Sequence, residues 1–271
     1  MTNIKYIKDM ISYNHVYTNN PKPQSFVYHH HDMYEILILI KGNAVHLVEG
    51  NYYDMPPYSL FFVRDNEFHQ LFPDLNKPYE RIVLAISKEF FKKYNCEQFK
   101  AIFENRKLGE GNLIKTERLL NSGIIECTER IEKYAQSDDE FMVNNAIIEF
   151  LYLLNSAGSS KMIPENNKTE IKPVIDYINE NFINNISLDE LSEAFFVSKP
   201  HLCRKFKKAT GMTINAYISH KRFLNIKALC DIGYTISEAA TSSGYNSYAN
   251  FYKAYVKEMG VSPKEGLKIK N

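Results

Sequence analysis

The C-terminal part of the chain contains one helical pattern twice, about fifty residues apart. The first copy begins with SLDELSEAFF, in which Ser187 and Glu190 have the spacing of a capping box. A short connection, FVS, leads to KPHLCRKFKKATG, which Gly211 ends. A short helix, a tight turn and a basic second helix predict a helix-turn-helix.

The second copy repeats these signals. Thr235 and Glu238 form another capping box, GYNS supplies the turn, and YANFYKAYVKEMG follows. The spacing of Leu202, Phe206 and Gly211 recurs in Phe251, Tyr255 and Gly260. Two helix-turn-helix modules are therefore expected in one chain.

Between the two copies, TINAYISHKRFLNIKALCDIG has the apolar spacing of one long helix. From Ile214 to Ile232 it has about nineteen residues and would span roughly 28 Å. Successive major grooves on one face of a DNA duplex are roughly 34 Å apart. One monomer should therefore contact two unlike base clusters about ten base pairs apart.

Composition favours a soluble globular chain with two domains, since 271 residues are 44% hydrophobic and 24% charged. From Ile171 onward the chain has 14 Lys and Arg against 9 Asp and Glu, so this part should meet an anion. Neither a membrane-length apolar run nor a secretory signal is found, so we expect a cytoplasmic protein without a membrane partner. The scattered cysteines favour reduced thiols.

The N-terminal part changes its periodicity once. Short β-rich runs, EILILI, AVHLVEG, YSLFFV, HQLF and RIVLAI, favour a β-barrel at about residues 20–87. Helical spacing follows at about residues 88–155. The polar stretch NSAGSSKMIPENNKTE then predicts a linker at 157–169, between domains at 1–156 and 170–271.

Two of the expected helices, IIECTERIEKYA and VNNAIIEFLYLLN, have long apolar stripes. A dimer contact and packing on the barrel would use this surface equally well. We expect a homodimer, with Met1 to about Asn155 dimerising on its own.

The residues of the C-terminal part resemble a known family. ISLDELSEAFFVSKPHLCRKFKKATGMT and YTISEAATSSGYNSYANFYKAYVKEMGVSP are similar to the DNA-binding domain of the AraC/XylS family of bacterial transcription regulators. The resemblance covers about Ile171 to Lys268 and departs from the usual pattern at Ser192, Ala239 and Val256. It implies double-stranded DNA as a partner, with RNA polymerase as a further candidate.

The resemblance also implies that exposed residues early in each second helix enter the major groove. Arg204 is the best candidate to read a base, because its planar fork can bond two acceptors of a guanine. Either phosphate binding or an ordinary charged helix face would explain Lys205, Lys207 and Lys208. The expected DNA-binding residues are Ser198, Pro200, His201, Cys203, Arg204, Lys207, Lys208, Ser247, Tyr248, Ala249, Tyr252 and Lys253.

A second candidate site lies in FVYHHHDMYEILILIKGN, where His29, His31 and Glu35 would share a strand face. This spacing resembles the first metal motif of the cupin β-barrel, and His69 could return one more ligand. The second motif is incomplete, and the sensor domain of the AraC/XylS family resembles a cupin that has lost its metal. We therefore expect these four residues to bind a small-molecule effector, such as a sugar or an aromatic acid, without a metal or other cofactor.

The expected fold class is thus α+β in two domains, a cupin-like β-barrel with helices followed by an all-α domain with two helix-turn-helix motifs. Two functions fit the sequence. The first is a non-enzymatic transcription regulator whose barrel binds an effector and whose C-terminal domain binds specific DNA. The alternative is a metal-dependent cupin enzyme that carries a DNA-binding domain.

Overall fold

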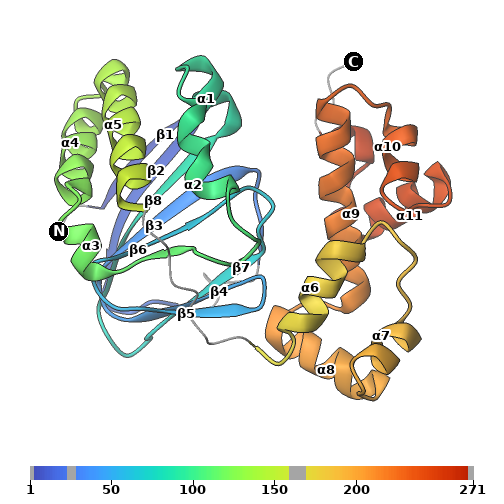
Figure 1. Ribbon diagram of the computed structural model, residues 1–271. Coiled ribbons are helices and arrows are strands. Elements are labelled where there is room, and N and C mark those ends of the chain that lie inside the picture. Colours follow the sequence, from blue (N-terminus) through green and yellow to red (C-terminus); the bar gives the residue numbers. More distant parts are fainter. Residues whose placement is uncertain (1–2, 23–28, 159–168, 268–271) are drawn as a thin grey trace. The chain divides into compact units, whose positions relative to one another are not determined.

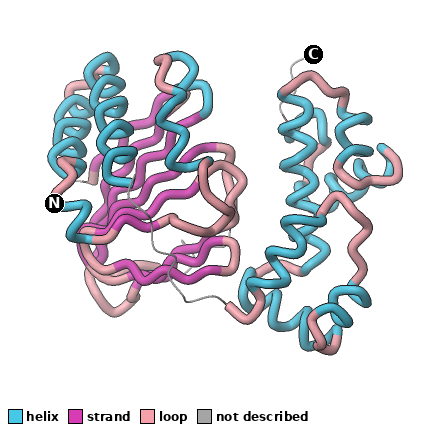
Figure 2. Tube along the Cα trace, in the orientation of Figure 1, coloured by secondary structure: helices cyan, strands magenta, loops and turns pink. Residues whose placement is uncertain are grey.

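The computed structural model describes residues 3–22, 29–158 and 169–267, which fall into two compact units, residues 1–168 and 169–271 (Figure 1). Figure 2 shows strands with helices in the first unit and helices in the second, so the expected fold class is confirmed. Residues 26–28 of the histidine-containing stretch lie outside the described part of the chain, and so do residues 159–168 of the expected linker.

The first unit contains two antiparallel sheets. The larger sheet has the order β1 (Ile4–Lys8), β2 (Ile11–Thr18), β8 (Tyr79–Ser87), β3 (Met33–Lys41), β6 (Ser59–Val63) and β9 (Leu113–Ile114). The smaller sheet has the order β5 (Asn51–Met55), β4 (Ala44–Val48) and β7 (His69–Pro73). Leu39 and Phe61 of the larger sheet share a buried core with Val48 and Tyr53 of the smaller one. Among the described residues the sheets face each other in a cupin-like arrangement and do not close into one barrel.

The five strands expected from the apolar runs are present, but the limits of the β-structure need correction. It begins well before residue 20, because β1 and β2 pair with each other and β2 pairs along β8. Their alternation is partly hidden by polar residues, although Tyr6 and Tyr13 are buried. The short strand β9 also interrupts the stretch expected to be helical and pairs with β6.

The helices of the first unit cover the outer face of the larger sheet (Figure 1). They are α1 (Lys88–Lys93), the 3-10 helix η2 (Glu97–Lys100), α2 (Ala101–Glu104), α3 (Thr116–Leu120), α4 (Ile124–Gln136) and α5 (Glu140–Gly158). The apolar stripes of α4 and α5 are packed in this core, with Ile131, Phe150 and Leu154 buried. Packing on the sheet therefore uses most of the surface that a dimer contact was expected to use.

Helix α5 also extends to Gly158, two residues into the segment expected as a linker at 157–169. Polar side chains in the last turns of α5 bond to the backbone one turn earlier. Asn155 Nδ2 donates to the carbonyl oxygen of Leu151, and Ser156 Oγ donates to that of Tyr152.

The second unit contains α6 (Lys172–Asn181), α7 (Leu188–Ala194), α8 (Lys199–Thr210), α9 (Ile214–Asp231), α10 (Ile236–Ser242), α11 (Tyr248–Met259) and α12 (Pro263–Gly266). Both expected capping boxes are present, at the starts of α7 and α10. Gly211 and Gly260 end α8 and α11 with a φ of 72°. The two helix-turn-helix modules are thus α7–α8 and α10–α11, joined by α9.

Each module has a buried aromatic core that includes residues of α9. Phe206 of α8 is buried against Tyr217 of α9, with ring centroids 5.5 Å apart. In the second module, Phe251 and Tyr255 of α11 surround Phe223 of α9. The connecting helix therefore belongs to both cores.

The connection between α6 and α7 is a further point of contact between the modules. Arg222 of α9 donates from Nε to the carbonyl oxygen of Phe182 and from Nη2 to that of Asn184, at 2.7 and 2.8 Å. Gly244, in the turn of the second module, lies so close that a Cβ there would be 2.3 Å from the carbonyl oxygen of Ile183. The first and second modules are therefore held together at this loop.

Candidate DNA-reading helices and histidine cluster

Helix α8 presents most of the residues that the sequence predicted for DNA contact in the first module. Ser198, Pro200, Arg204, Lys207 and Lys208 are exposed. Two others, His201 and Cys203, are partly buried on the same helix. The guanidinium Nη2 of Arg204 lies 3.2 Å from His201 Nδ1, so these two side chains form one polar group.

Two cations of α8 are engaged within the C-terminal unit. Lys205 forms an ion pair with Glu170, and Lys199 forms one with Asp189 of α7. These pairs are solvent-exposed and can exchange for phosphate contacts at little cost. Lys207 and Lys208 lie in the last turn of α8 and remain the stronger candidates for phosphate contacts.

Helix α11 presents Tyr248, Ala249, Tyr252 and Lys253 to solvent, as expected. The rings of Tyr248 and Tyr252 lie 6.1 Å apart and form an exposed aromatic pair. The predicted contact residue Ser247 is the N-cap, and its hydroxyl accepts a bond from the Asn250 backbone N–H at 3.2 Å.

Sequence reasoning missed Asn250, which is exposed on α11 beside these residues. An asparagine amide can bond two atoms of an adenine edge, whereas alanine offers only a methyl group. The signal was available, because Asn250 follows the N-cap Ser247 by three residues and so lies in the first turn of the reading helix.

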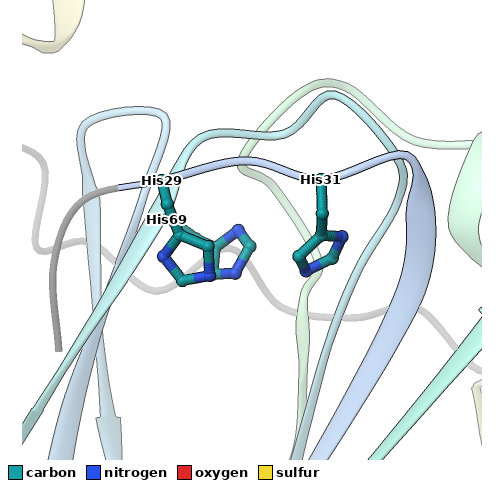
Figure 3. A group of neighbouring side chains, drawn as sticks. All are labelled: His29, His31 and His69. Carbon is teal, nitrogen blue, oxygen red and sulfur yellow. The ribbon is translucent and has the colours of Figure 1, made fainter. Parts of the chain in front are cut away.

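In the first unit, the structure brings together all four residues expected in the second site. One nitrogen from each of His29, His31 and His69 lies within 4.8 Å of the other two (Figure 3). Glu35 is adjacent, with Oε2 3.2 Å from His31 Nε2 and Oε1 3.7 Å from His69 Nε2. We call these four residues the histidine cluster.

The backbone arrangement that forms this cluster differs from the single strand face that was expected. Strand β3 begins only at Met33, so Glu35 is on the strand and both His29 and His31 precede it. His29 instead pairs with His69 through two backbone hydrogen bonds of 3.0 and 2.9 Å. The cluster therefore joins the entry to β3 with the start of β7.

Hydrogen bonds fix the ring orientation of two of the histidines. Nδ1 of His31 lies 2.8 Å from the carbonyl oxygen of Met33, and Nδ1 of His69 lies 2.8 Å from that of Glu67. A carbonyl oxygen can only accept, so each Nδ1 carries a proton. In each ring, Nε2 is the atom that points toward Glu35.

The charges of the cluster follow from burial and from these contacts. Burial would raise the pKa of Glu35, but the hydrogen bond from His31 lowers it below its usual range, so the carboxylate is ionised. Burial lowers the pKa of His69 to about 4, despite the opposing effect of Glu35, so this ring is neutral at pH 7. Burial also opposes protonation of His31, yet its bond to Glu35 produces a net rise in the pKa of His31.

His46 is a fifth residue near the cluster, and the sequence did not single it out. Its ring lies 5.6 Å from that of His69 and stacks on Phe61 at 3.9 Å. Burial holds the pKa of His46 well below its usual value, so the ring is neutral. The alternation of residues 44–48 predicted a strand here, but no local signal shows that this strand pairs with β7 and so brings His46 near His69.

The chain combines a β-rich domain that has a convergent polar site with two helix-turn-helix modules, which defines a ligand-controlled, DNA-binding transcription regulator. Residues 15–117 match the AraC-like ligand binding domain family, and residues 191–268 match a helix-turn-helix domain family. The two matches together show an AraC-type transcription regulator, with a ligand-binding domain followed by a helix-turn-helix domain.

Several known proteins are similar over most of their length. The HTH-type transcriptional activators RhaS of Yersinia pestis bv. Antiqua (strain Angola) and of Yersinia pseudotuberculosis serotype O:1b (strain IP 31758) are each 25% identical over 251 residues, 90% of each chain. The solved structure of ToxT from Vibrio cholerae O395 is 13% identical, with a TM-score of 0.40, over 97% of this chain and 98% of that one. Among the described residues, no helix is long and apolar enough to cross a membrane.

Proposed function

We propose that the chain is a one-component regulator in which each helix-turn-helix module reads one base cluster of an operator. The observation that carries this proposal is the pair of exposed helices α8 and α11, both held by α9. Helix α9 has 18 residues and spans about 27 Å, compared with about 34 Å between successive major grooves. The two clusters should therefore lie about ten base pairs apart and differ in sequence.

We assign the base-reading role in the first module to Arg204, with Ser198, Pro200, His201 and Cys203 beside it and Lys207 and Lys208 on phosphates. In the second module the corresponding residues are Ser247, Tyr248, Ala249, Tyr252 and Lys253, to which Asn250 is added. Selection from random DNA, followed by footprinting, tests this geometry. A single contact of about five base pairs per monomer would contradict it.

Arg204→Ala and Lys208→Ala should affect DNA binding in different ways. Loss of Arg204 should cost about 1 to 3 kcal/mol on the selected operator and relax the preference at one cluster. Loss of Lys208 should weaken binding to all sequences and reduce the salt slope by about 1, because one phosphate contact is lost. Titrations of operator and scrambled DNA at several salt concentrations measure both effects. If Arg204→Ala weakens binding to every DNA sequence equally, Arg204 does not read a base.

We also propose that the N-terminal domain binds a small-molecule effector, a sugar or an aromatic acid, at His29, His31, Glu35 and His69. The support is the convergence of four polar side chains in the domain that matches a ligand-binding family. A metabolite screen by thermal melting tests this, because a ligand at 100 times its dissociation constant adds about 2.7 kcal/mol. Chemical turnover of such a ligand would instead favour the alternative, a cupin enzyme with a DNA-binding domain.

We expect the full chain to form a homodimer in the cytoplasm, with RNA polymerase as a further partner because its relatives RhaS are named as activators. Because the stripes of α4 and α5 are buried, we place the dimer contact at the apolar residues that α5 leaves outside. Phe141 is 74% exposed and Tyr152 is 59% exposed. Replacing both with serine should convert a dimeric mass to a monomeric one in sedimentation at micromolar concentration. Phe72→Ser is the control, and a monomeric parent chain would contradict this expectation.

A further inference from the structure

We infer that the histidine cluster binds a divalent first-row transition-metal ion through His29, His31 and His69, with Glu35 as a fourth ligand. This inference deepens the proposed effector site, on which it rests, by stating what the cluster holds. The sequence alone favoured an effector pocket without metal. The hydrogen bonds of the cluster favour a cation instead.

The groups that converge in the cluster are donors of electron pairs. The Nδ1–H of His69 donates a hydrogen bond to the Glu67 carbonyl oxygen, so Nε2 of the neutral ring carries a lone pair. This nitrogen is buried and makes no hydrogen bond to any described residue. Its nearest acidic neighbour is the Glu35 carboxylate at 3.7 Å, which is also an acceptor. Two acceptors that face each other in a buried site repel, and a cation between the Nε2 lone pair and the carboxylate would satisfy both.

His31 shows the same arrangement. Its Nδ1 bonds to the Met33 carbonyl oxygen, and its Nε2 lies 3.2 Å from Glu35 Oε2. Without a metal, this contact requires a proton on Nε2. A metal ion would replace that proton and would satisfy His31, His69 and Glu35 together.

The outer contacts of the cluster are those of metal-binding histidines. A ligating imidazole usually donates its second ring N–H to a carbonyl or carboxylate oxygen, which fixes its orientation. Met33 and Glu67 serve this purpose for His31 and His69. The carboxylate of Glu67 accepts two hydrogen bonds from Arg106, of 2.7 and 2.6 Å. The residue whose carbonyl oxygen orients His69 is therefore itself fixed in position.

The distances suit a single atom better than an organic group. Nitrogens that share a zinc ion are each about 2.0 to 2.1 Å from it, and are therefore about 3 to 3.5 Å apart. The three ring nitrogens already lie within 4.8 Å of one another, so side-chain shifts of about 1 Å would complete the site. Imidazole and carboxylate ligands suit zinc, iron, nickel, copper and cobalt. With these four ligands, an ion that takes five or six ligands would keep a position for an oxygen atom of an effector.

The experiment is a titration of the untagged full chain with Co2+ after treatment with a chelator. We expect one Co2+ per chain, with a visible absorption band, and displacement of that band by Zn2+. His69→Ala and His31→Gln should each weaken Co2+ binding at least roughly 100-fold. His31 is the safer variant for folding, because its side chain is 24% exposed whereas that of His69 is 2% exposed.

His30→Ala is the matched control. His30 lies between two of the ligands in sequence but packs edge-on against Phe68, and this variant should bind Co2+ as the parent does. Absence of Co2+ binding at a hundred micromolar ion, or equal binding by the His31→Gln and parent chains, would overturn the inference. The cobalt spectrum needs no DNA and no effector, so its failure would leave the operator proposal standing, and a failed metabolite screen would leave the metal site standing.

Discussion

Arg106→Met should lower the free energy of unfolding of the N-terminal domain by about 3 to 5 kcal/mol. The Arg106 guanidinium forms two bonds to the carboxylate of Glu67, whose side chain is fully buried. The Gly109 backbone N–H and the Asn112 amide also donate to this carboxylate. Removing Arg106 leaves a buried negative charge without its cation. Urea unfolding, followed by hydrogen exchange of peptides from β6 and β7, measures the loss in this domain.

The pH dependence makes this prediction more specific. Burial would raise the pKa of Glu67, but Arg106 lowers it below its usual value. In the parent chain this carboxylate therefore adds stability at neutral pH, and that stability is lost as the pH falls through the lowered pKa. In Arg106→Met, burial should raise the pKa above its unfolded value, so the variant loses stability as the pH rises. The deficit should be smaller at pH 4 than at pH 7.

Arg130→Met is the control for this substitution. Arg130 forms an ion pair of 2.6 Å with Glu149, but the two side chains are 39% and 46% exposed. Because water screens this pair, its loss should cost at most about 1 kcal/mol. Equal losses in the two variants would show that burial of Glu67 does not determine the effect.

Gly244→Ala should destabilise the C-terminal domain by about 2 to 5 kcal/mol. Gly244 has a φ of 90°, which disfavours any residue with a side chain, and the added Cβ would be 2.3 Å from the Ile183 carbonyl oxygen. Backbone must move, because the three nearest atoms all belong to the backbone of Ile183. Hydrogen exchange of peptides from α10 and α11 and operator binding should both show the change.

Gly260→Ala separates the cost of the positive φ from the cost of the contact with Ile183. Gly260 has a φ of 72°, but a Cβ added there would have no heavy atom within 4 Å. This variant should therefore show only the backbone cost, about 1 to 2 kcal/mol. If Gly244→Ala costs no more than Gly260→Ala, the contact with Ile183 is not tight.

The C-terminal domain could be predicted closely because its signals are local. Each capping box needs only two residues three apart, and one glycine ends the second helix of each module. Ser187 and Glu190 therefore mark the start of α7, and Gly211 marks the end of α8. The contact between Gly244 and Ile183 could not be predicted. It depends on how the second module packs on a loop about sixty residues earlier in the chain.

In the N-terminal domain, the expected strands were found, and the four residues of the histidine cluster do lie together. The protonation of the cluster could not be predicted, because it depends on backbone carbonyl oxygens of Met33 and Glu67. The pairing of Glu67 with Arg106 also has no sequence signal, since a charged pair 39 residues apart looks like two solvated side chains. Because the pair is buried in the folded domain, it fixes Glu67 just before β7 and His69.

The two hydrogen bonds from Arg222 to the α6–α7 connection limit how this regulator can respond to a signal. Together with Gly244, they link the modules so that α8 and α11 cannot separate unless these contacts break. An allosteric signal that changed the distance between the modules would have to overcome this coupling. A signal that releases or positions the whole C-terminal domain meets no such cost. Effector binding should therefore change the affinity for both base clusters by the same factor and leave the ranking of operator sequences unchanged.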